Sequence, residues 1–423
     1  MLNLNNGSVG LIGYGVSNKA LCKYLMGKGI YPTVHAPTSC SIPKGMSCVF
    51  GEGYLDNLEE TVFRSPGVHP GKIGKKSYTE VEYGFDLIDT FKVGITGSDG
   101  KTTTSTLVYL MLMRGGKNTF LAGNIGKPVI EIAPLVRAED FLVCELSSFQ
   151  LYGFEPCLDV GVITNISENH LDWHADMDDY INAKKNILAK SKRRVLNFDC
   201  PIVKEMAKDC TTYFSLRDCS SYLGNGHDFV HVVGGAVYYN EALLFFVKDV
   251  CLKGEFNLQN ILCATAVAYP IVGKEAVERV AREFCGVENR MEQVCQIDGV
   301  TYICSAIDTT PERTRKTLSA FDISKVVPIL GGSHKGLSYD CLGDVLQNAK
   351  AVILCGANSE MIRKSLNRQA IKVNTLEEAV NVAKGLCDHG DFVILTPASA
   401  SFDMFENYKE KAKCFKNVVR GLR

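Results

Sequence analysis

The chain has 423 residues, a length that favours about three domains at roughly 150 residues each. Hydrophobic residues make up 46% of the sequence, as in an ordinary globular protein, and the formal net charge is -1. This charge gives no reason to expect nucleic acid or an anionic membrane surface as a partner. No apolar run approaches about 18 residues and no basic segment precedes a long apolar stretch, so we expect a cytoplasmic protein without membrane insertion.

The first segment, about residues 1–90, opens with a strand-like run at 9–12. A turn with the sequence Gly13-Tyr14-Gly15-Val16-Ser17-Asn18 follows, and a helical stretch then runs from Lys19 to Gly27. Two of the three glycines of a dinucleotide-binding turn are present, and Asn18 occupies the place of the third. Alone, this pattern is a weak indication of a phosphate-binding strand, turn and helix.

The cysteines number seventeen, and they are scattered along the chain. No two are spaced as Cys-x-x-Cys, so the sequence predicts neither a zinc site nor a redox motif. We expect most of them to be small buried side chains in a reducing compartment.

The most informative stretch opens the second segment, about residues 91–289. Residues 94–104 read Gly-Ile-Thr-Gly-Ser-Asp-Gly-Lys-Thr-Thr-Thr, directly after a strand-like run and before a helical one. The usual nucleotide loop requires a glycine where Ile95 stands, so the strict pattern fails by one residue. Glycines let a backbone turn its N–H groups toward phosphate oxygens, Lys101 adds a positive charge, and the Thr102 hydroxyl suits Mg²⁺.

Strand-like and helical stretches alternate through the rest of the chain. Strands are expected at 141–144, 160–164 and 194–197, and again at 326–330, 351–355 and 392–396. Such runs are typical of parallel strands buried on both faces, whereas 211–253 reads as an antiparallel excursion. The sequence therefore predicts an α/β fold with three domains: Rossmann-like, a central mononucleotide-binding parallel sheet, and a second Rossmann-like domain over 290–423.

Two loops that follow predicted strands carry candidate metal ligands. Glu145 ends an apolar strand, where a carboxylate suits a hard cation, although an exposed loop acid is the simpler alternative. Asn165 and His170 lie in a second loop of this kind among other polar residues. A single histidine is usually structural, but one surrounded by Asn, Glu and Asp at a strand end is a better ligand candidate.

Taken together, these motifs resemble the Mur ligases that build the peptidoglycan stem peptide. The similarity covers nearly the whole chain, and it is greatest to the type that adds D-glutamate to UDP-N-acetylmuramoyl-L-alanine. Three features favour that type: Ser147-Ser148-Phe149-Gln150, the turn Gly331-Gly332-x-x-Lys335, and Ser-Phe-Asp-x-Phe-x-Asn-Tyr at 401–408. Further matches are Gly123-Asn124-Ile125-Gly126, residues 165–172, residues 180–184 and Asn257-Leu258-Gln259-Asn260.

The resemblance implies a set of functional residues. The UDP substrate would lie near Gly13, Gly15 and Ser17. Two Mg²⁺ ions would be held by Thr102, Glu145, His170 and Lys184, with Lys184 present as its carbamate. The catalytic residues would be Lys101, Lys184, His170 and Glu145. ATP would be held by Gly97, Ser98, Asp99, Gly100, Lys101, Thr102, Thr103, Asn257, Asn260 and Arg290. The remaining substrate-binding residues would be Asn124, Ser147, Gln150, Thr309, Lys335, Ser401, Phe402 and Tyr408.

Several positions depart from the family pattern. Ser305 and Ile307 replace an aspartate and a lysine, and Lys411-Ala412 replaces an Arg-Gly pair. Phe256 stands for a common histidine, and His35 for an acidic residue near the uracil. Three readings stay open: a monomeric D-glutamate ligase using ATP and Mg²⁺, another Mur or folylpolyglutamate-type ligase, and a non-catalytic relative that binds nucleotide or UDP-sugar. Without the resemblance, Lys184 would read as a solvated helical lysine beside Lys185.

Overall fold

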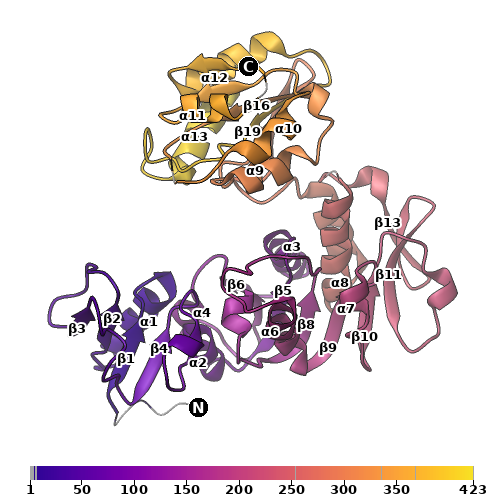
Figure 1. The fold of residues 1–423 in the computed structure, drawn as a ribbon. Coiled ribbons are helices and arrows are strands. Elements are labelled where there is room, and N and C mark those ends of the chain that lie inside the picture. Colours follow the sequence, from indigo (N-terminus) through magenta and orange to yellow (C-terminus); the bar gives the residue numbers. More distant parts are fainter. Residues whose placement is uncertain (1–3, 5–6, 253, 335, 367, 423) are drawn as a thin grey trace. The chain divides into compact units, whose positions relative to one another are not determined.

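A computed structural model describes residues 4, 7–252, 254–334, 336–366 and 368–422 (Figure 1). The chain forms two compact units, Met1–Phe284 and Cys285–Arg423, which contain three sheets in total. The expected three-sheet α/β fold is therefore confirmed, while domain boundaries at 90 and 289 stay a prediction. Among the described residues, no helix is long and apolar enough to cross a membrane. Fifteen of the cysteines are free thiols.

The N-terminal sheet of the first unit is parallel, with strand order β3-β2-β1-β4. Its strands are β1 (Val9–Ile12), β2 (Thr33–Ala36), β3 (Cys48–Phe50) and β4 (Thr61–Arg64). Helix α1 (Val16–Gly27) follows β1, and helix α2 (Glu80–Leu87) follows the sheet. Leu11, Leu21, Phe63 and Tyr83 share one hydrophobic core with Ile130 of the short helix α4 (Val129–Ile132), which belongs to the central part of the chain.

The central sheet has nine strands in the order β13-β12-β11-β10-β9-β8-β5-β7-β6. They are β5 (Phe91–Thr96), β6 (Thr119–Gly123), β7 (Phe141–Glu145), β8 (Cys157–Ile163), β9 (Lys190–Asn197), β10 (Thr211–Phe214), β11 (Asp228–Val233), β12 (Ala236–Tyr239) and β13 (Ala242–Phe246). The predicted antiparallel excursion is confirmed for β11 to β13. The expectation is wrong for β10, which pairs in parallel with both neighbours.

Helices on the central sheet carry much of the predicted site. They are α3 (Lys101–Arg114), α5 (Ser148–Leu151), α6 (Met177–Ala189), α7 (Pro201–Lys204) and α8 (Glu255–Glu283). Helix α8 contains Pro270 and breaks at Gly273, whose φ is 76°. A Cβ atom on Gly115 would lie 2.3 Å from Val272, so α3 ends in close contact with α8.

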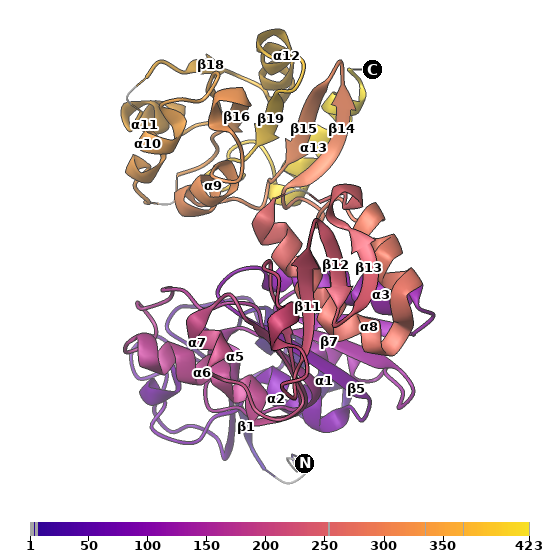
Figure 2. The same ribbon diagram turned by 90° about the vertical axis from the view of Figure 1, so that its right-hand side faces the viewer.

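The second unit holds a six-stranded sheet in the order β14-β15-β19-β16-β17-β18. Its strands are β14 (Glu292–Ile297), β15 (Val300–Cys304), β16 (Val326–Leu330), β17 (Ile353–Cys355), β18 (Ile371–Val373) and β19 (Phe392–Leu395). The longer helices are α9 (Pro311–Leu318), α11 (Ser359–Lys364), α12 (Leu376–Leu386) and α13 (Tyr408–Arg420), and α10 (Gly343–Leu346) is short. Figure 2 shows the antiparallel strand β14 at the edge, beside β15 and α13. The three strands expected here are present, whereas the β14–β15 hairpin was not anticipated.

Candidate active site

The phosphate loop joins β5 to α3 and is held in a tight turn. Gly97 has φ 154° and Gly100 has φ 79°. A Cβ atom would lie 1.9 Å from Thr164 Oγ1 at the first position and 2.2 Å from Asn260 Oδ1 at the second, so both positions require glycine. The Asp99 N–H donates to Asn165 Oδ1 over 2.9 Å. Asn165, which the sequence offered as a metal-ligand candidate, accepts this hydrogen bond and so helps to fix the loop.

Lys101 begins α3 and curls back over the loop. Its Nζ donates to the carbonyl oxygens of Gly97 and Ser98, over 2.8 and 2.9 Å. The N–H groups at the start of a helix are not used within the helix, so an anion is favoured there. The loop, the lysine and the start of the fourteen-residue helix α3 thus meet at one place, with the composition that a polyphosphate requires.

Glu145 is the last residue of β7 and is 1% exposed. Its Oε2 accepts a hydrogen bond from the Thr102 hydroxyl, and its Oε1 accepts one from the Asn124 side-chain amide, each over 2.8 Å. Asn124 follows β6, which pairs with β7, so the sheet order brings these residues together. A carboxylate, a hydroxyl and an amide at one sheet edge form a donor set suited to a hard cation.

Lys184 lies on α6 and is 2% exposed, whereas its neighbour Lys185 is exposed. Its Nζ donates to the Gly97 carbonyl oxygen over 2.7 Å and lies 4.6 Å from the centre of the Tyr180 ring. Burial holds the pKa of Lys184 well below its ordinary range, and the charge of Lys101 lowers it further. The side chain is therefore a buried amine directed at the phosphate loop, not a solvated helical lysine.

His170 follows β8 in a loop whose backbone is left-handed at that residue, with φ 58°. Its ring centre lies 5.0 Å from that of Phe149 and 6.4 Å from that of Tyr180. Partial burial and the charges of Lys101 and Lys184 lower the pKa of His170, which favours the neutral, ligand-competent imidazole. The structure thus gathers six predicted residues around the phosphate loop: Lys101, Thr102, Asn124, Glu145, His170 and Lys184.

Ser147 and Gln150, both predicted to contact substrate, also have structural partners. They form a capping box at the start of α5: the Ser147 Oγ accepts from the Gln150 N–H over 3.3 Å, and the Gln150 Oε1 accepts from the Ser147 N–H over 2.9 Å. Gln150 is buried, while Ser147 is partly exposed. The cap fixes the loop that follows Glu145.

Asn257 and Asn260, which the resemblance assigns to ATP binding, lie near the start of α8. Asn257 and Asn260 are both buried, and the Asn260 Oδ1 accepts a hydrogen bond from the Thr104 hydroxyl over 3.3 Å. Thr103 is buried within the first turn of α3. These residues belong to the same unit as Lys101, so the predicted nucleotide contacts of α8 and α3 lie side by side.

The predicted UDP-side residues lie at the carboxyl end of β1, in the other sheet of the first unit. Gly13 has φ 73°, and a Cβ atom there would lie 3.1 Å from the Ser65 side chain. Asn18 is fully buried and donates to the carbonyl oxygens of Ile12 and Gly13, which explains the replacement of the third glycine. Gly15 and Ser17 complete this turn at the start of α1. His35 is paired with Glu59 over 2.7 Å, so an acid is present near the position that the family usually gives to one.

The second unit holds the remaining candidates. Ser401 is 2% exposed, and its hydroxyl has no hydrogen-bond partner among the described residues. A backbone bridge between Ser333 and Ala400 brings the Gly331-Gly332 turn beside it. Phe402 is 72% exposed, and Tyr408 begins α13. Thr309 lies before α9, Arg290 lies before β14, and Lys335 lies outside the described residues.

The sequence did not reveal the importance of Lys411, which is 1% exposed. Its Nζ donates to the Gly331 carbonyl oxygen over 2.6 Å, directly under the glycine turn. The sequence did contain one indication of this burial. Lys411 lies at helical spacing from Phe415 and Val419, so all three side chains lie on the buried face of α13. Tyr180 was also overlooked, although its hydroxyl is 2.9 Å from the Ser98 Oγ.

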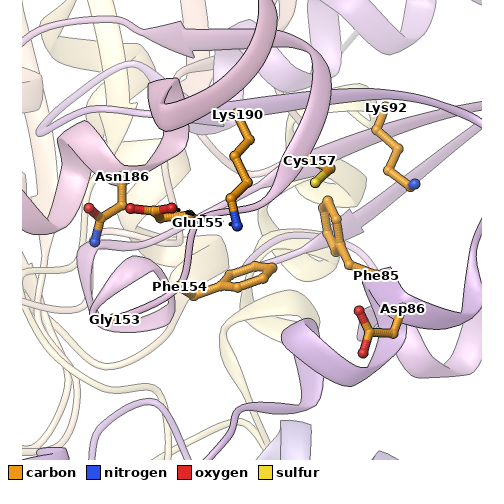
Figure 3. Close-up of a pocket in the computed structure, with 9 residues that line it drawn as sticks. All are labelled: Phe85, Asp86, Lys92, Gly153, Phe154, Glu155, Cys157, Asn186 and Lys190. Carbon is orange, nitrogen blue, oxygen red and sulfur yellow. Dashed lines mark ion pairs between the residues drawn. The ribbon is translucent and has the colours of Figure 1, made fainter. Parts of the chain in front are cut away.

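A cavity of about 530 Å³ lies away from these residues, at the amino ends of β5 and β8 (Figure 3). Figure 3 shows Phe85 between Lys190 and Lys92 and Phe154 below Lys190, whose ammonium group pairs with Glu155 over 3.6 Å. The phosphate loop follows the carboxyl end of β5, so the cavity is at the opposite edge of the sheet. It takes no part in the candidate site.

Comparisons with known proteins agree with this architecture. The Mur ligase middle domain matches residues 95–268, and the Mur ligase glutamate ligase domain matches residues 289–399. UDP-N-acetylmuramoylalanine–D-glutamate ligase of Acetivibrio thermocellus is 36% identical, over 99% of this chain and 97% of its own. The enzyme of the same name from Clostridium tetani is 35% identical over the same shares.

Solved structures show the same fold at lower identity. The UDP-N-acetylmuramate-alanine ligase MurC of Thermotoga maritima has a TM-score of 0.61 and 18% identity, covering 99% of this chain and 100% of its own. The MurF ligase of the same organism, solved with ADP, has a TM-score of 0.53 and 15% identity, covering 100% and 98%. The chain belongs to the Mur ligase family of ATP-dependent ligases. Within that family, the two full-length relatives named above are D-glutamate ligases.

Proposed function

We propose that this chain joins D-glutamate to UDP-N-acetylmuramoyl-L-alanine, converting ATP to ADP and phosphate, in the synthesis of peptidoglycan precursors. Full-length identity of about 35% to ligases of that name supports the assignment. The observation that carries the chemistry is the buried carboxylate of Glu145, held by Thr102 and Asn124 beside the phosphate loop. An arrangement of this kind handles phosphoryl transfer by positioning and charge stabilisation.

The phosphate loop and its neighbours in the first unit would hold the nucleotide. The N–H groups of the phosphate loop and the start of α3 would take the phosphates, through Gly97, Ser98, Asp99, Gly100, Thr102 and Thr103. Lys101 would leave the carbonyl oxygens of its own loop and turn its charge to the phosphates. Asn257 and Asn260 would lie on the adenine side, and Arg290 is a further proposed nucleotide-binding residue.

The donor set fits Mg²⁺, because it offers oxygen ligands beside a phosphate site. Thr102, Glu145, His170 and the carbamate of Lys184 would hold two such ions, which neutralise phosphate charge when bound. Lys184 supports this proposal on physical grounds, since burial and a neighbouring lysine favour its neutral amine. A neutral amine adds CO₂ and loses a proton, and the product is an anionic oxygen donor, whereas an ammonium group cannot bind a cation.

The reaction has two steps. The L-alanyl carboxylate oxygen attacks the γ-phosphorus, the bond to the β-phosphate oxygen breaks, and ADP leaves. The amine of D-glutamate then attacks the acyl carbon, the bond to the phosphate oxygen breaks, and the amine gives up a proton as the amide forms. Lys101 would stabilise the charge that spreads over the transferred group, and the buried setting would strengthen that effect.

The two other substrates would be held at separate strand ends. The UDP part would lie at Gly13, Gly15 and Ser17, with the acyl end near Asn124, Ser147 and Gln150. D-glutamate would be held by Thr309, Lys335, Ser401, Phe402 and Tyr408. The buried hydroxyl of Ser401, unpartnered among the described residues, supports this placement, because such a group is normally hydrogen-bonded.

We propose a cytoplasmic monomer with domains at 1–90, 91–289 and 290–423.

One assay tests the function. The purified protein is given ATP, Mg²⁺, UDP-N-acetylmuramoyl-L-alanine and D-glutamate, and phosphate release is followed. Release that depends on all three organic substrates is expected. Release with another amino acid but not with D-glutamate would indicate a different ligase of the family. Binding of ATP without any release would indicate a non-catalytic relative, a possibility that the replacements at Ser305 and Ile307 raise.

A further inference from the structure

His174 lies at the centre of a buried chain of side-chain hydrogen bonds close to the proposed site. It is 2% exposed, and both ring nitrogens are engaged. Nδ1 is 2.8 Å from Asp179 Oδ2, and Nε2 is 3.0 Å from the Ser148 Oγ. A carboxylate only accepts, so Nδ1 carries a proton; in the neutral imidazole, Nε2 then accepts from the Ser148 hydroxyl.

The chain connects two segments that carry proposed site residues. Ser148 is the first residue of α5, directly after Ser147 and close behind Glu145. Asp179 lies in the first turn of α6, the helix that carries Lys184. His174 therefore joins the loop after β7 to the start of α6. Ser148 and His174 are 26 residues apart in the sequence.

The connection continues into the phosphate loop. Tyr180, the residue after Asp179, places its hydroxyl 2.9 Å from the Ser98 Oγ. The His174 ring packs against the Tyr180 ring with centres 5.2 Å apart and the planes nearly perpendicular. Ser148, His174, Asp179, Tyr180 and Ser98 thus form one continuous set of contacts from the loop after Glu145 to the phosphate loop.

Serine, histidine and aspartate in this order also suggest a hydrolase, but the geometry excludes that use. Ser148 is 3% exposed and begins a helix, and the His174 ring is enclosed by the rings of Phe149, Trp173 and Tyr180. A nucleophilic serine must reach a substrate carbonyl, and this hydroxyl is closed off from solvent.

We propose that His174 is a positioning residue for the ligase reaction, fixing α6 against the loop after β7 so that Lys184 and Glu145 keep their separation. This inference rests on the proposed function. A displacement of about 1 Å at a reacting centre can cost on the order of 100-fold in rate. We therefore expect His174→Ala to lower kcat at least tenfold, while the KM values for the three substrates change by less than about threefold.

The variants separate the hydrogen bonds from simple packing. Ser148→Ala removes one bond and leaves the His174–Asp179 pair, so a smaller fall in kcat is expected. Asp179→Asn keeps an acceptor for the Nδ1–H and should retain most of the activity, whereas Asp179→Ala should behave as His174→Ala does. An inactive Asp179→Asn variant would mean that the charge of Asp179, and not its hydrogen bond to His174, supports kcat. That result would overturn the positioning role.

His231 provides a matched control. It is 1% exposed, lies on β11, and has both ring nitrogens engaged: Nδ1 accepts from the Cys219 N–H over 3.1 Å, and Nε2 is 2.9 Å from the Asn240 carbonyl oxygen. His231→Ala therefore creates a similar cavity and loses two similar contacts. We expect it to lower the denaturation midpoint about as much as His174→Ala does, with kcat within twofold of the wild type.

A second measurement does not depend on turnover. Amide hydrogen exchange is followed in the phosphate loop and in the first half of α6, over residues 95–101 and 177–184. Faster exchange in both segments in His174→Ala, but not in His231→Ala, supports the inference even if the wild-type protein releases no phosphate and the proposed function fails. Unchanged exchange in His174→Ala, or an equal loss of kcat in the two alanine variants, overturns it.

Discussion

Gly100 and Gly116 stand at the two ends of α3 and allow a sharp test of the phosphate loop. Their φ angles are 79° and 78°, so alanine at either position meets the same left-handed backbone. The surroundings differ. A Cβ atom on Gly100 would lie 2.2 Å from Asn260 Oδ1, whereas a Cβ atom on Gly116 has nothing within 4 Å. Gly116→Ala is therefore the control for Gly100→Ala.

The expected effects follow from these contacts. Both variants bear about 1–2 kcal/mol of backbone strain, because an L-residue is disfavoured in this region. Gly100→Ala must also displace Asn260 and so lose its hydrogen bond from Thr104, at roughly 1 kcal/mol. Since Asn260 is proposed to hold the nucleotide, we expect kcat/KM for ATP to fall about fivefold or more relative to Gly116→Ala, because roughly 1 kcal/mol is lost and about 1.4 kcal/mol corresponds to a factor of ten.

The assay is phosphate release at varied ATP, with the other substrates saturating. Urea denaturation of both variants measures the shared strain and the additional loss at Gly100. Gly116→Ala should keep the wild-type KM for ATP within about twofold. Equal kcat/KM values for ATP in the two variants would refute the reasoning, because the clash with Asn260 would then have no effect on the nucleotide site.

Three further predictions concern buried charged groups. Lys184→Ala should lose most phosphate release, and added bicarbonate should not restore it, because no amine remains to form a carbamate; near-normal activity would contradict the carbamate. Burial raises the pKa of Glu80 to about 7 from an ordinary 4.5, so the folded state holds the proton over this window and the free energy of unfolding falls by roughly 3 kcal/mol as pH rises through it. Burial raises the pKa of Glu82 to about 7 as well, so Glu80→Gln should reduce but not abolish the fall between pH 5 and pH 8 in urea denaturation, and an unchanged fall would exclude Glu80 as a source. Lys411→Met should raise the KM for D-glutamate at least tenfold, because the buried side chain of Lys411 supports the Gly331 turn through its hydrogen bond. Lys411→Arg should raise this KM much less. Equal KM values in Lys411→Met and the wild type would count against this prediction.

The parts of the fold that the sequence predicted are those with a local pattern. The phosphate loop combines a strand, three glycines and a lysine within a short stretch, and the buried strands of the parallel sheets are continuous apolar runs. The β14–β15 hairpin and the pairing of β10 had no such pattern. Strand direction depends on which neighbour a strand finds, and short alternating runs such as Thr211–Phe214 suit parallel and antiparallel partners equally.

The same distinction applies to the site. Glu145, Asn124 and Thr102 could be expected to meet, because each follows a strand of one parallel sheet and the carboxyl ends of such strands share an edge. The Ser148–His174–Asp179 contacts had no comparable basis, since they depend on how a loop folds between two helices. Gln150 matches a functional motif in the sequence, but it also completes the helix cap with Ser147. The hydrogen bonds of that cap are seen only in the structure.

The cluster around Ser305 shows how a departure from the family pattern can be resolved by packing. The family pattern described above has aspartate where Ser305 stands, whereas this chain carries a carboxyl group three positions further on, at Asp308. Asp308 is buried, is hydrogen-bonded to Ser305, and its Oδ2 accepts from the Thr317 and Thr396 hydroxyls over 2.8 and 3.0 Å.

This setting accommodates Ser305 and Asp308 together. Burial raises the pKa of Asp308, while its three hydroxyl donors and the nearby Arg290 oppose that rise. An aspartate at both 305 and 308 would place two carboxyl groups in one buried cluster, where like charges cannot both ionise. Serine at 305 instead gives Asp308 a hydroxyl donor. This chain therefore places one carboxyl group, that of Asp308, in a buried cluster with the Thr317 and Thr396 hydroxyls and near Arg290, within the core of the second unit.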